Sequence, residues 1–202
     1  MLAFLLMAAL NNSIDDLVAK VVTAYGGGAA WQSVASFRET GTVIPAMRPG
    51  EGKLTRHWQR PDKLRVEIVY PSNTEIRVVE GDHGTQNGKE ATGMGLDAMR
   101  LQAARLGLPL LLEQKKSSLR SAGENTIEIL LAPQMTLTIE VDPASGHIIK
   151  SVGKAEGIEF TTRYSDFRML DGLLFAFREE NSAQGTKTGT NEIDKIELTR
   201  TK

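Results

Sequence analysis

Apolar residues first recur at helical spacing close to the N-terminal end of the chain. They fall three or four positions apart, at Ile14, Leu17, Val18, Val21 and Val22. Ser13 can cap the start of this helix, and Gly26-Gly27-Gly28 can end it. The pattern predicts a first helix that begins after Ser13, and a second short helical piece over residues 29–34.

Further along the chain the period of the pattern falls to two. Such alternation is typical of strands with one buried and one solvated face. Turn signals such as Arg60-Pro61-Asp62 and Asn87-Gly88 separate these runs, and connections this short join antiparallel neighbours. We therefore predict about nine to eleven antiparallel strands. The clearest runs are Leu64–Tyr70, Ile127–Leu131, Leu137–Val141 and Ile158–Tyr164.

The segment from Gly95 to Leu112 interrupts the strands with helical spacing. Pro109 is expected to end or kink this helix. A surface helix normally has one apolar face. The segment is therefore either a tightly packed core helix or a lid that faces both the sheet and a ligand. One apolar stripe contains Leu96, Met99, Ala103, Leu106 and Leu110, and the other contains Leu101, Leu108 and Leu112.

A sheet of about ten strands is too wide for two helices to cover. At about 4.8 Å per strand it spans about 50 Å, whereas one helix covers about 10 Å. The apolar face can leave water only if the sheet curls. Aromatic residues make up only 5% of the chain, which favours an unfilled cavity inside the curl. The predicted fold class is α+β, mostly antiparallel β: an unclosed half β-barrel with a helical lid.

Composition narrows the classes of function. The 24 basic and 25 acidic residues give a net charge of −1, so we expect no nucleic acid as a partner. The chain has no cysteine, which excludes disulfides, thiolate nucleophiles and thiolate zinc sites. Its 202 residues suit one domain, which we expect over residues 13–202.

The first residues resemble the core of a secretion signal. Leu2–Leu10 is an uncharged apolar run followed by polar Asn11-Asn12. Nine residues suit such a signal and are far below the roughly 18–20 that span a bilayer. We predict that residues 1–12 are the remnant of a signal peptide. The alternative is an apolar N-terminal helical turn packed on the domain.

No residue pattern indicates a catalytic centre. His57, His83 and His147 are not at metal-ligand spacing, and Asp82-His83 fits a surface turn. Glu179 and Glu180 alternate along a strand, so their carboxylates are expected to point to opposite faces. We therefore predict no catalytic residue, no metal and no cofactor, and we expect that the protein is not an enzyme.

Several motifs share their order with one known family. The stretch His57–Arg65, with its Arg60-Pro61 turn, resembles a strand–turn–strand of the lipoprotein carrier LolA and its relatives. Glu75–Gly81, Leu137–Gly146 and the stretch from Tyr164 to Gly172 resemble later motifs of that family in the same order. In place of the carriers' C-terminal loop, residues 190–198 have the pattern of one more strand.

The resemblance implies an open barrel whose helices form a lid over an apolar cavity that holds lipoprotein acyl chains. Arg60 matches an arginine that bonds to the lid in that family, so we take it as the expected lid latch. The resemblance also implies a periplasmic location in a Gram-negative-type envelope and a hydrophobic ligand. A membrane-associated donor or acceptor protein is an expected partner, and a monomer is the expected state.

From the pattern we select eleven candidate ligand-binding residues. The expected lid lining is Leu96, Met99, Leu101, Leu106, Leu108 and Leu110, and the expected cavity floor is Leu64, Val66, Ile68, Ile76 and Val78. The same positions are compatible with a dry core. The alternative function is then a cell-envelope interaction module with a filled barrel, which acts through its surface and binds no ligand.

Overall fold

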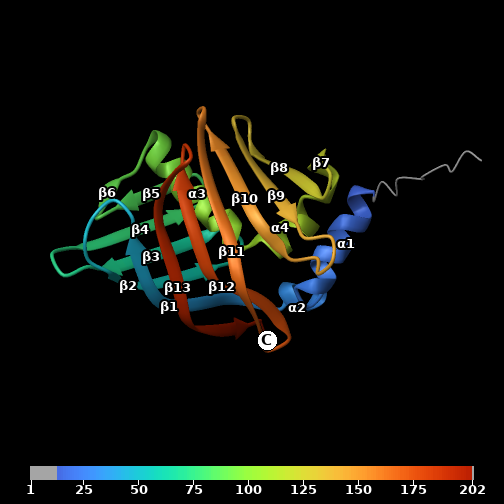
Figure 1. Ribbon diagram of the computed structural model, residues 1–202, viewed down its shortest axis with the longest axis horizontal. Helices are drawn as coiled ribbons and strands as arrows, with labels where there is room; N and C mark the ends of the chain where they lie inside the picture. The colour runs from blue at the N-terminus through green and yellow to red at the C-terminus, as the bar shows by residue number, and fades with distance from the viewer. Residues whose placement is uncertain (1–12, 202) are drawn as a thin grey trace, which may run out of the picture.

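The computed structural model describes residues 13–201, and the predicted signal segment lies outside this range. All strands join one antiparallel sheet, whose order is β6-β5-β4-β3-β2-β1-β13-β12-β11-β10-β9-β8-β7 (Figure 1). The sheet does not close into a barrel, because β6 and β7 lie at its two ends. The strands are β1 (Val34–Pro45), β2 (Gly52–Gln59), β3 (Lys63–Val69), β4 (Thr74–Glu80), β5 (His83–Gln86), β6 (Lys89–Glu90), β7 (Leu119–Gly123), β8 (Thr126–Ala132), β9 (Met135–Val141), β10 (Ile148–Ala155), β11 (Ile158–Leu170), β12 (Leu173–Ala183) and β13 (Thr186–Arg200).

The alternating pattern predicts the sheet well, and the predicted fold class is confirmed. In β9, for example, every second residue from Met135 to Val141 is buried. The sheet has more strands than the expected nine to eleven, because short segments near its ends lack alternation. Strand β6 has only two residues, and no residue of β7 is fully buried. Strand β13 contains the expected C-terminal strand over residues 190–198.

Within residues 13–201, four α-helices accompany the sheet: α1 (Ile14–Ala24), α2 (Gly28–Gln32), α3 (Gly93–Leu106) and α4 (Leu108–Gln114), with a short 3-10 turn at Lys116–Ser118. Ser13 caps α1 as predicted, and its side chain and that of Asp16 each bond to the other's backbone. The predicted helix over residues 95–112 is two helices that meet at Gly107. Pro109 lies in the first turn of α4, where a missing N–H is tolerated. No helix within residues 13–201 combines the length and apolar character needed to cross a bilayer.

Helix α3 is buried on two sides, as its two apolar stripes predict. Gly84 on β5 lies so close to α3 that a Cβ there would be 2.8 Å from Met99 Cε. On the other side, a Cβ at Gly153 on β10 would lie 2.7 Å from Leu101 Cδ2. Figure 1 shows α3 between the two halves of the sheet. The sheet therefore forms a trough, and α3 lies inside it.

Aromatic side chains fill one end of the trough. Phe37 on β1 stacks on Trp58 on β2, with ring centroids 5.2 Å apart, and contacts Phe175 on β12 at 5.6 Å. Phe175 also contacts Trp31 of α2. Gly107, at the junction of α3 and α4, allows the helices to approach Trp58, since a Cβ there would lie 2.9 Å from its ring. The described residues form no such ring cluster at the opposite end of the trough, and the candidate site is found there.

Candidate functional site

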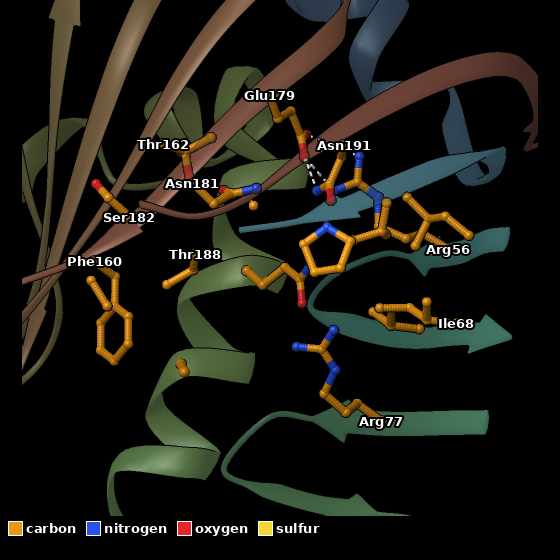
Figure 2. Close-up of a pocket in the computed structure, with 18 of the residues that line it drawn as sticks. Arg56, Ile68, Arg77, Phe160, Thr162, Glu179, Asn181, Ser182, Thr188 and Asn191 are labelled. Carbon is orange, nitrogen blue, oxygen red and sulfur yellow. Dashed lines mark hydrogen bonds and ion pairs between the residues drawn. The ribbon is translucent and has the colours of Figure 1, made fainter. Parts of the chain in front are cut away.

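A cavity of about 500 Å³ lies between the concave face of the sheet and α3. Its walls come from β1–β4, from β11–β13 and from one face of α3. This volume falls within the roughly 300–1,000 Å³ that is typical of small-molecule sites. Figure 2 shows side chains from both halves of the sheet converging on this space.

One part of the cavity wall is apolar. It is formed by alternate residues of β1, β2 and β3, which point into the trough, and by residues from β11 and α3. Cross-strand pairing explains their alignment, because Leu54 on β2 pairs with Ile68 on β3. The apolar lining includes Val43, Leu54, Val66, Ile68, Leu106 and Phe160.

A buried ionic cluster forms the inner end of the cavity. Arg56 donates from its two Nη atoms to Glu179 at 2.7 and 2.9 Å (Figure 2). Its Nε donates to Glu39 at 2.6 Å. Asn191 adds a hydrogen bond to Glu179 at 2.8 Å. Arg56, Glu39 and Glu179 are all buried, with side-chain exposures of 2%, 4% and 10%. A purely apolar cavity was expected, and the lining is instead amphipathic, because these inward strand positions carry charge.

The cluster perturbs the pKa values of its members in different directions. Burial raises the pKa of Glu39, although Arg56 opposes this effect. Burial acts on Glu179 in the same sense, but the charge and hydrogen bonds of Arg56 outweigh it and lower the pKa of Glu179. Burial disfavours the charged form of Arg56, yet two adjacent carboxylates raise its pKa further above its ordinary range. The guanidinium is therefore a permanent cation that holds both acids.

The contact between Arg56 and Glu179 shows how strongly the sheet curls. Strands β2 and β12 are three positions apart in the sheet order, with β1 and β13 between them. In a flat sheet they would lie about 14 Å apart. Arg56 and Glu179 nevertheless form two hydrogen bonds across the trough. The side chains meet because the sheet bends around them.

A second arginine enters the cavity wall from α3. Arg105 donates from Nε to Ser151 Oγ at 3.0 Å and from Nη2 to the Phe160 carbonyl at 2.5 Å. The Tyr164 hydroxyl is hydrogen-bonded to Ser151 at 2.7 Å, and burial raises the pKa of Tyr164 to about 12. Burial also lowers the pKa of Arg105. These bonds attach α3 to the strands of the C-terminal half of the sheet.

Two further arginines belong to the N-terminal half of the wall. Arg48 bonds to Glu75 at 2.8 Å and lies over the Tyr70 ring, 3.5 Å from its centroid. Arg77 on β4 points into the cavity (Figure 2). Its Nε is buried without a hydrogen-bond partner, and within residues 13–201 Arg77 forms no ion pair. Burial lowers the pKa of Arg77.

The candidate ligand-binding residues divide by position. Val66, Ile68 and Leu106 border the cavity, and Leu106 also borders, with Leu108, a second cavity of about 60 Å³. Leu96 is half-buried beside Gly84. Leu110 borders a groove on another side of α3 and α4. The buried residues Leu64, Met99 and Leu101 border neither cavity.

Ile76 and Val78 lie away from the cavity. In the register of β3 and β4, Val66 pairs with Arg77 and Leu64 pairs with Val79. Alternate residues of a strand point to opposite faces, so Ile76 and Val78 point out of the trough. Glu75 and Arg77 take the floor positions that we expected for these two residues. The shift of one position along β4 places charge where the pattern predicted apolar side chains.

Arg60 contacts a helix other than the leucine-bearing segment. Its Nη1 donates to the carbonyl of Gln32, the last residue of α2, at 2.6 Å. The last carbonyls of a helix lack partners within the helix, so a guanidinium suits this position. Arg200 on β13 holds the same helix by bonding to the Ala30 carbonyl at 3.3 Å. A latch role for Arg60 would therefore act through α2.

The expected site residues did not include four charged residues that are buried or half-buried here: Glu39, Arg56, Arg77 and Arg105. The sequence did indicate a buried position for Arg56. In the alternating pattern of β2 it lies between Leu54 and Trp58, which both point inward. For the two adjacent acids on β12 the expectation is confirmed, because Glu179 is buried and Glu180 pairs outside with Arg178 at 3.0 Å.

The histidines lie outside the cavity. His57 and His83 are exposed, and the His83 imidazole lies 3.2 Å from the carboxylate of its neighbour Asp82. His147 packs on Phe167, with ring centroids 4.5 Å apart. Within the part of the chain that the structure describes, no three His, Asp or Glu side chains are arranged to hold a metal ion.

Comparison with known proteins identifies the fold. No protein-family model matches the sequence, and no curated protein matches it significantly. Solved structures do match over most of their length. A LolA superfamily protein from Nitrosomonas europaea has a TM-score of 0.56 and 9% identity, with 92% of this chain and 93% of that chain covered. A domain from Vibrio parahaemolyticus that is named for outer membrane lipoprotein sorting has a TM-score of 0.54 and 8% identity, with 91% of each chain covered.

A third match is a DUF1329 family protein from Desulfovibrio piger, with a TM-score of 0.52, 8% identity and 92% coverage of each chain. The chain therefore shares its fold, an open half-barrel with helices in the trough, with these solved structures. At identities of 8–9% this likeness concerns the fold. It agrees with the resemblance expected from the sequence motifs.

Proposed function

We propose that the protein is an exported carrier or binding protein for lipid-like, acyl-bearing cargo in the periplasm. The observation that carries the proposal is the cavity of about 500 Å³ between the sheet and α3, with an apolar wall formed by β1–β3 and Leu106. The shared fold adds support, because one matching structure is named for lipoprotein sorting.

Burial of an acyl chain would drive binding. Each buried methylene contributes about 0.8 kcal/mol, so a chain of about a dozen methylenes gains several kcal/mol after the costs of ordering. The apolar wall provides the contact surface, with Val66 and Ile68 on one side and Leu106 on the other. We further propose that the protein acts as a monomer and exchanges cargo with membrane-associated donor or acceptor proteins.

The apolar run over Leu2–Leu10 supports export as part of this proposal. The alternative, an interaction module with a filled barrel, requires an interior occupied by the protein's own side chains. The cavity favours the carrier over that alternative. No role in catalysis is proposed, because the cavity lining contains no histidine, serine–base pair or metal cluster within residues 13–201.

The test is to block the cavity from α3. Ala98 borders the cavity, whereas Ala104, on the same helix, borders a groove on another side of it. We expect purified wild-type protein to bind dansylaminoundecanoic acid, with a rise in probe fluorescence. Ala98→Trp should weaken this binding by at least tenfold, because an indole in the cavity displaces the chain.

Ala104→Trp is the matched control and should bind the probe as the wild type does. Circular dichroism and thermal unfolding would show that both variants fold. Wild-type protein that does not bind the probe, or equal binding by both variants, would contradict the proposed site.

A further inference from the structure

Within residues 13–201, Arg77 differs from the other arginines of the cavity in having no hydrogen bond or ion pair from its side chain. Arg56 is neutralised by Glu39 and Glu179, and Arg48 is paired with Glu75. Arg105 donates hydrogen bonds to the Ser151 hydroxyl and the Phe160 carbonyl. The guanidinium of Arg77 faces the cavity, its Nε is buried, and within the described residues it makes no side-chain hydrogen bond (Figure 2).

Arg77 is half-buried, and an unpaired guanidinium nitrogen that is shielded from water, as its Nε is, is costly. Buried polar groups are nearly always hydrogen-bonded, and a buried charge normally has a counter-charge. The nearest acid of its own strand, Glu75, is occupied by Arg48. Burial accordingly lowers the pKa of Arg77. A ligand that brings a negative group into the cavity would supply the missing partner.

The net charge of the cavity lining also favours a negatively charged ligand. Four arginines and two glutamates line it, so the lining is formally positive. It remains positive when Glu39, which lies behind Arg56, is included. The whole chain carries a net charge of −1. The positive lining is therefore a local property of the cavity, and it suits an anion that enters from solvent.

We propose that Arg77 binds the acidic headgroup of an anionic amphiphile whose chain lies along the apolar wall. This inference rests on the proposed function and defines the class of its ligand. Val66 pairs with Arg77 across β3 and β4, so an apolar contact lies directly beside the cation. A guanidinium offers a planar fork that matches the oxygens of a carboxylate or a phosphate. Either a free fatty acid or a phosphate-bearing lipid provides such a group.

The experiment uses three ligands that share one chain: decanoic acid, decyl phosphate and decanol. Isothermal titration calorimetry at neutral pH gives each affinity for the wild type, Arg77→Met, Arg77→Lys and Arg65→Met. Arg65 is the matched control, because it lies on the adjacent strand with its side chain exposed on the outer face. Charge-assisted hydrogen bonds predict at least tenfold tighter binding of the acids than of decanol to the wild type.

Arg77→Met should abolish that preference and leave decanol binding unchanged, which also shows that the variant is folded. Arg77→Lys should keep part of the preference, and Arg65→Met should keep all of it. A preference for decyl phosphate would indicate a phospholipid-type ligand, and one for decanoate a fatty acid; both support the inference.

Three results would overturn it. Equal affinity of the wild type for all three ligands would refute headgroup recognition and leave the proposed lipid binding intact. A preference for acids that survives in Arg77→Met would remove Arg77 from the site. Binding of none of the three would refute the proposed function together with the inference.

Discussion

Arg56 on β2 holds Glu179 on β12 through two hydrogen bonds of 2.7 and 2.9 Å, although 123 residues separate them in the chain. The contact crosses the trough and marks the boundary between its two ends. On one side lie the stacked rings of Phe37 and Trp58, and on the other lies the cavity. Arg56 therefore lies where the aromatic core ends and the candidate site begins.

The first prediction concerns removal of that cation. Arg56→Met leaves two buried carboxylates without a counter-charge. We expect the free energy of unfolding to fall by about 3–5 kcal/mol at neutral pH, the usual cost of breaking a buried ion pair from one side. The loss should shrink as the pH falls, because protonation removes the uncompensated charges. Urea unfolding at several pH values measures both effects.

Arg38→Met provides the control for this change. Arg38 lies on β1, is 55% exposed, and forms only a loose surface pair with Glu197 at 3.9 Å. Its removal should change the free energy of unfolding by no more than about 0.5 kcal/mol. If Arg56→Met were equally mild at neutral pH, the cluster would not have the structural weight that we assign to it.

The second prediction concerns the pH dependence that Glu39 contributes. Burial raises the pKa of Glu39 above its ordinary value of 4.5, so the folded state favours the protonated acid. Its stabilising contribution is thus present below pH 4.5 and is lost as the pH rises through the raised pKa. Glu39→Gln imitates the protonated acid and should become more stable relative to the wild type as the pH rises.

The measurement is the difference in free energy of unfolding between wild type and Glu39→Gln from about pH 4.5 to about pH 8. Glu179, whose pKa is lowered, contributes with the opposite sign and is present in both proteins, so the difference reports the charge of Glu39 together with its repulsion of Glu179. A difference that does not vary with pH, or that varies in the other direction, would contradict the assigned shift.

The sheet could be predicted because one face of each strand is repeatedly apolar. In β3, the residues Leu64, Val66 and Ile68 alternate with charged neighbours, and this pattern defines both the strand and its buried face. The extended helical segment was also visible, since its two apolar stripes required burial on two sides. Where an apolar pattern extends over a whole strand or helix, the face that it predicts to be buried is the face that packs in the folded protein.

The ionic lining could not be predicted in the same way. Arg56 and Glu179 look like any other strand charges until the curl brings their strands together, and that curl depends on the whole sheet. In β4 the sequence has Ile76 and Val78 at one phase and Arg77 at the other, so a pattern that places apolar residues inside selects the wrong face. Only the register with β3 determines which face points into the trough.

The third prediction tests the packing of α3 against β10. Gly153→Ala adds a methyl group that would lie 2.7 and 2.8 Å from the two δ carbons of Leu101, which is fully buried. We expect a loss of about 1–3 kcal/mol in the free energy of unfolding from overpacking. Leu101→Ala alone should cost about 2–5 kcal/mol, because it leaves a cavity.

Chemical denaturation of the single and double variants tests the contact directly. In the double variant the new methyl group occupies space that Leu101 has left, so its cost should be smaller than the sum of the single costs by at least about 0.5 kcal/mol. Strict additivity would mean that Gly153 and Leu101 do not pack against each other.

The final prediction concerns Arg60 as a latch. Arg60→Leu removes the 2.6 Å hydrogen bond to the Gln32 carbonyl at the end of α2. We expect a modest loss of about 0.5–1.5 kcal/mol in the free energy of unfolding, since Arg200 still holds this helix. If α2 must stay in place to retain cargo, the variant should also release dansylaminoundecanoic acid faster. Helix α2 contacts α4, which is part of the leucine-bearing segment, so a change at α2 can affect that segment.

Stopped-flow release of the probe measures this effect, and Arg65→Leu is the control. Arg65 is exposed on β3 and forms a surface ion pair with Glu67 at 3.0 Å, so its loss should leave both release and stability unchanged. If Arg60→Leu loses stability and its release rate stays that of the wild type, Arg60 is a structural fastening of α2 with no role in retaining cargo. Faster release at nearly unchanged stability would instead place α2, together with α3 and α4, in the lid.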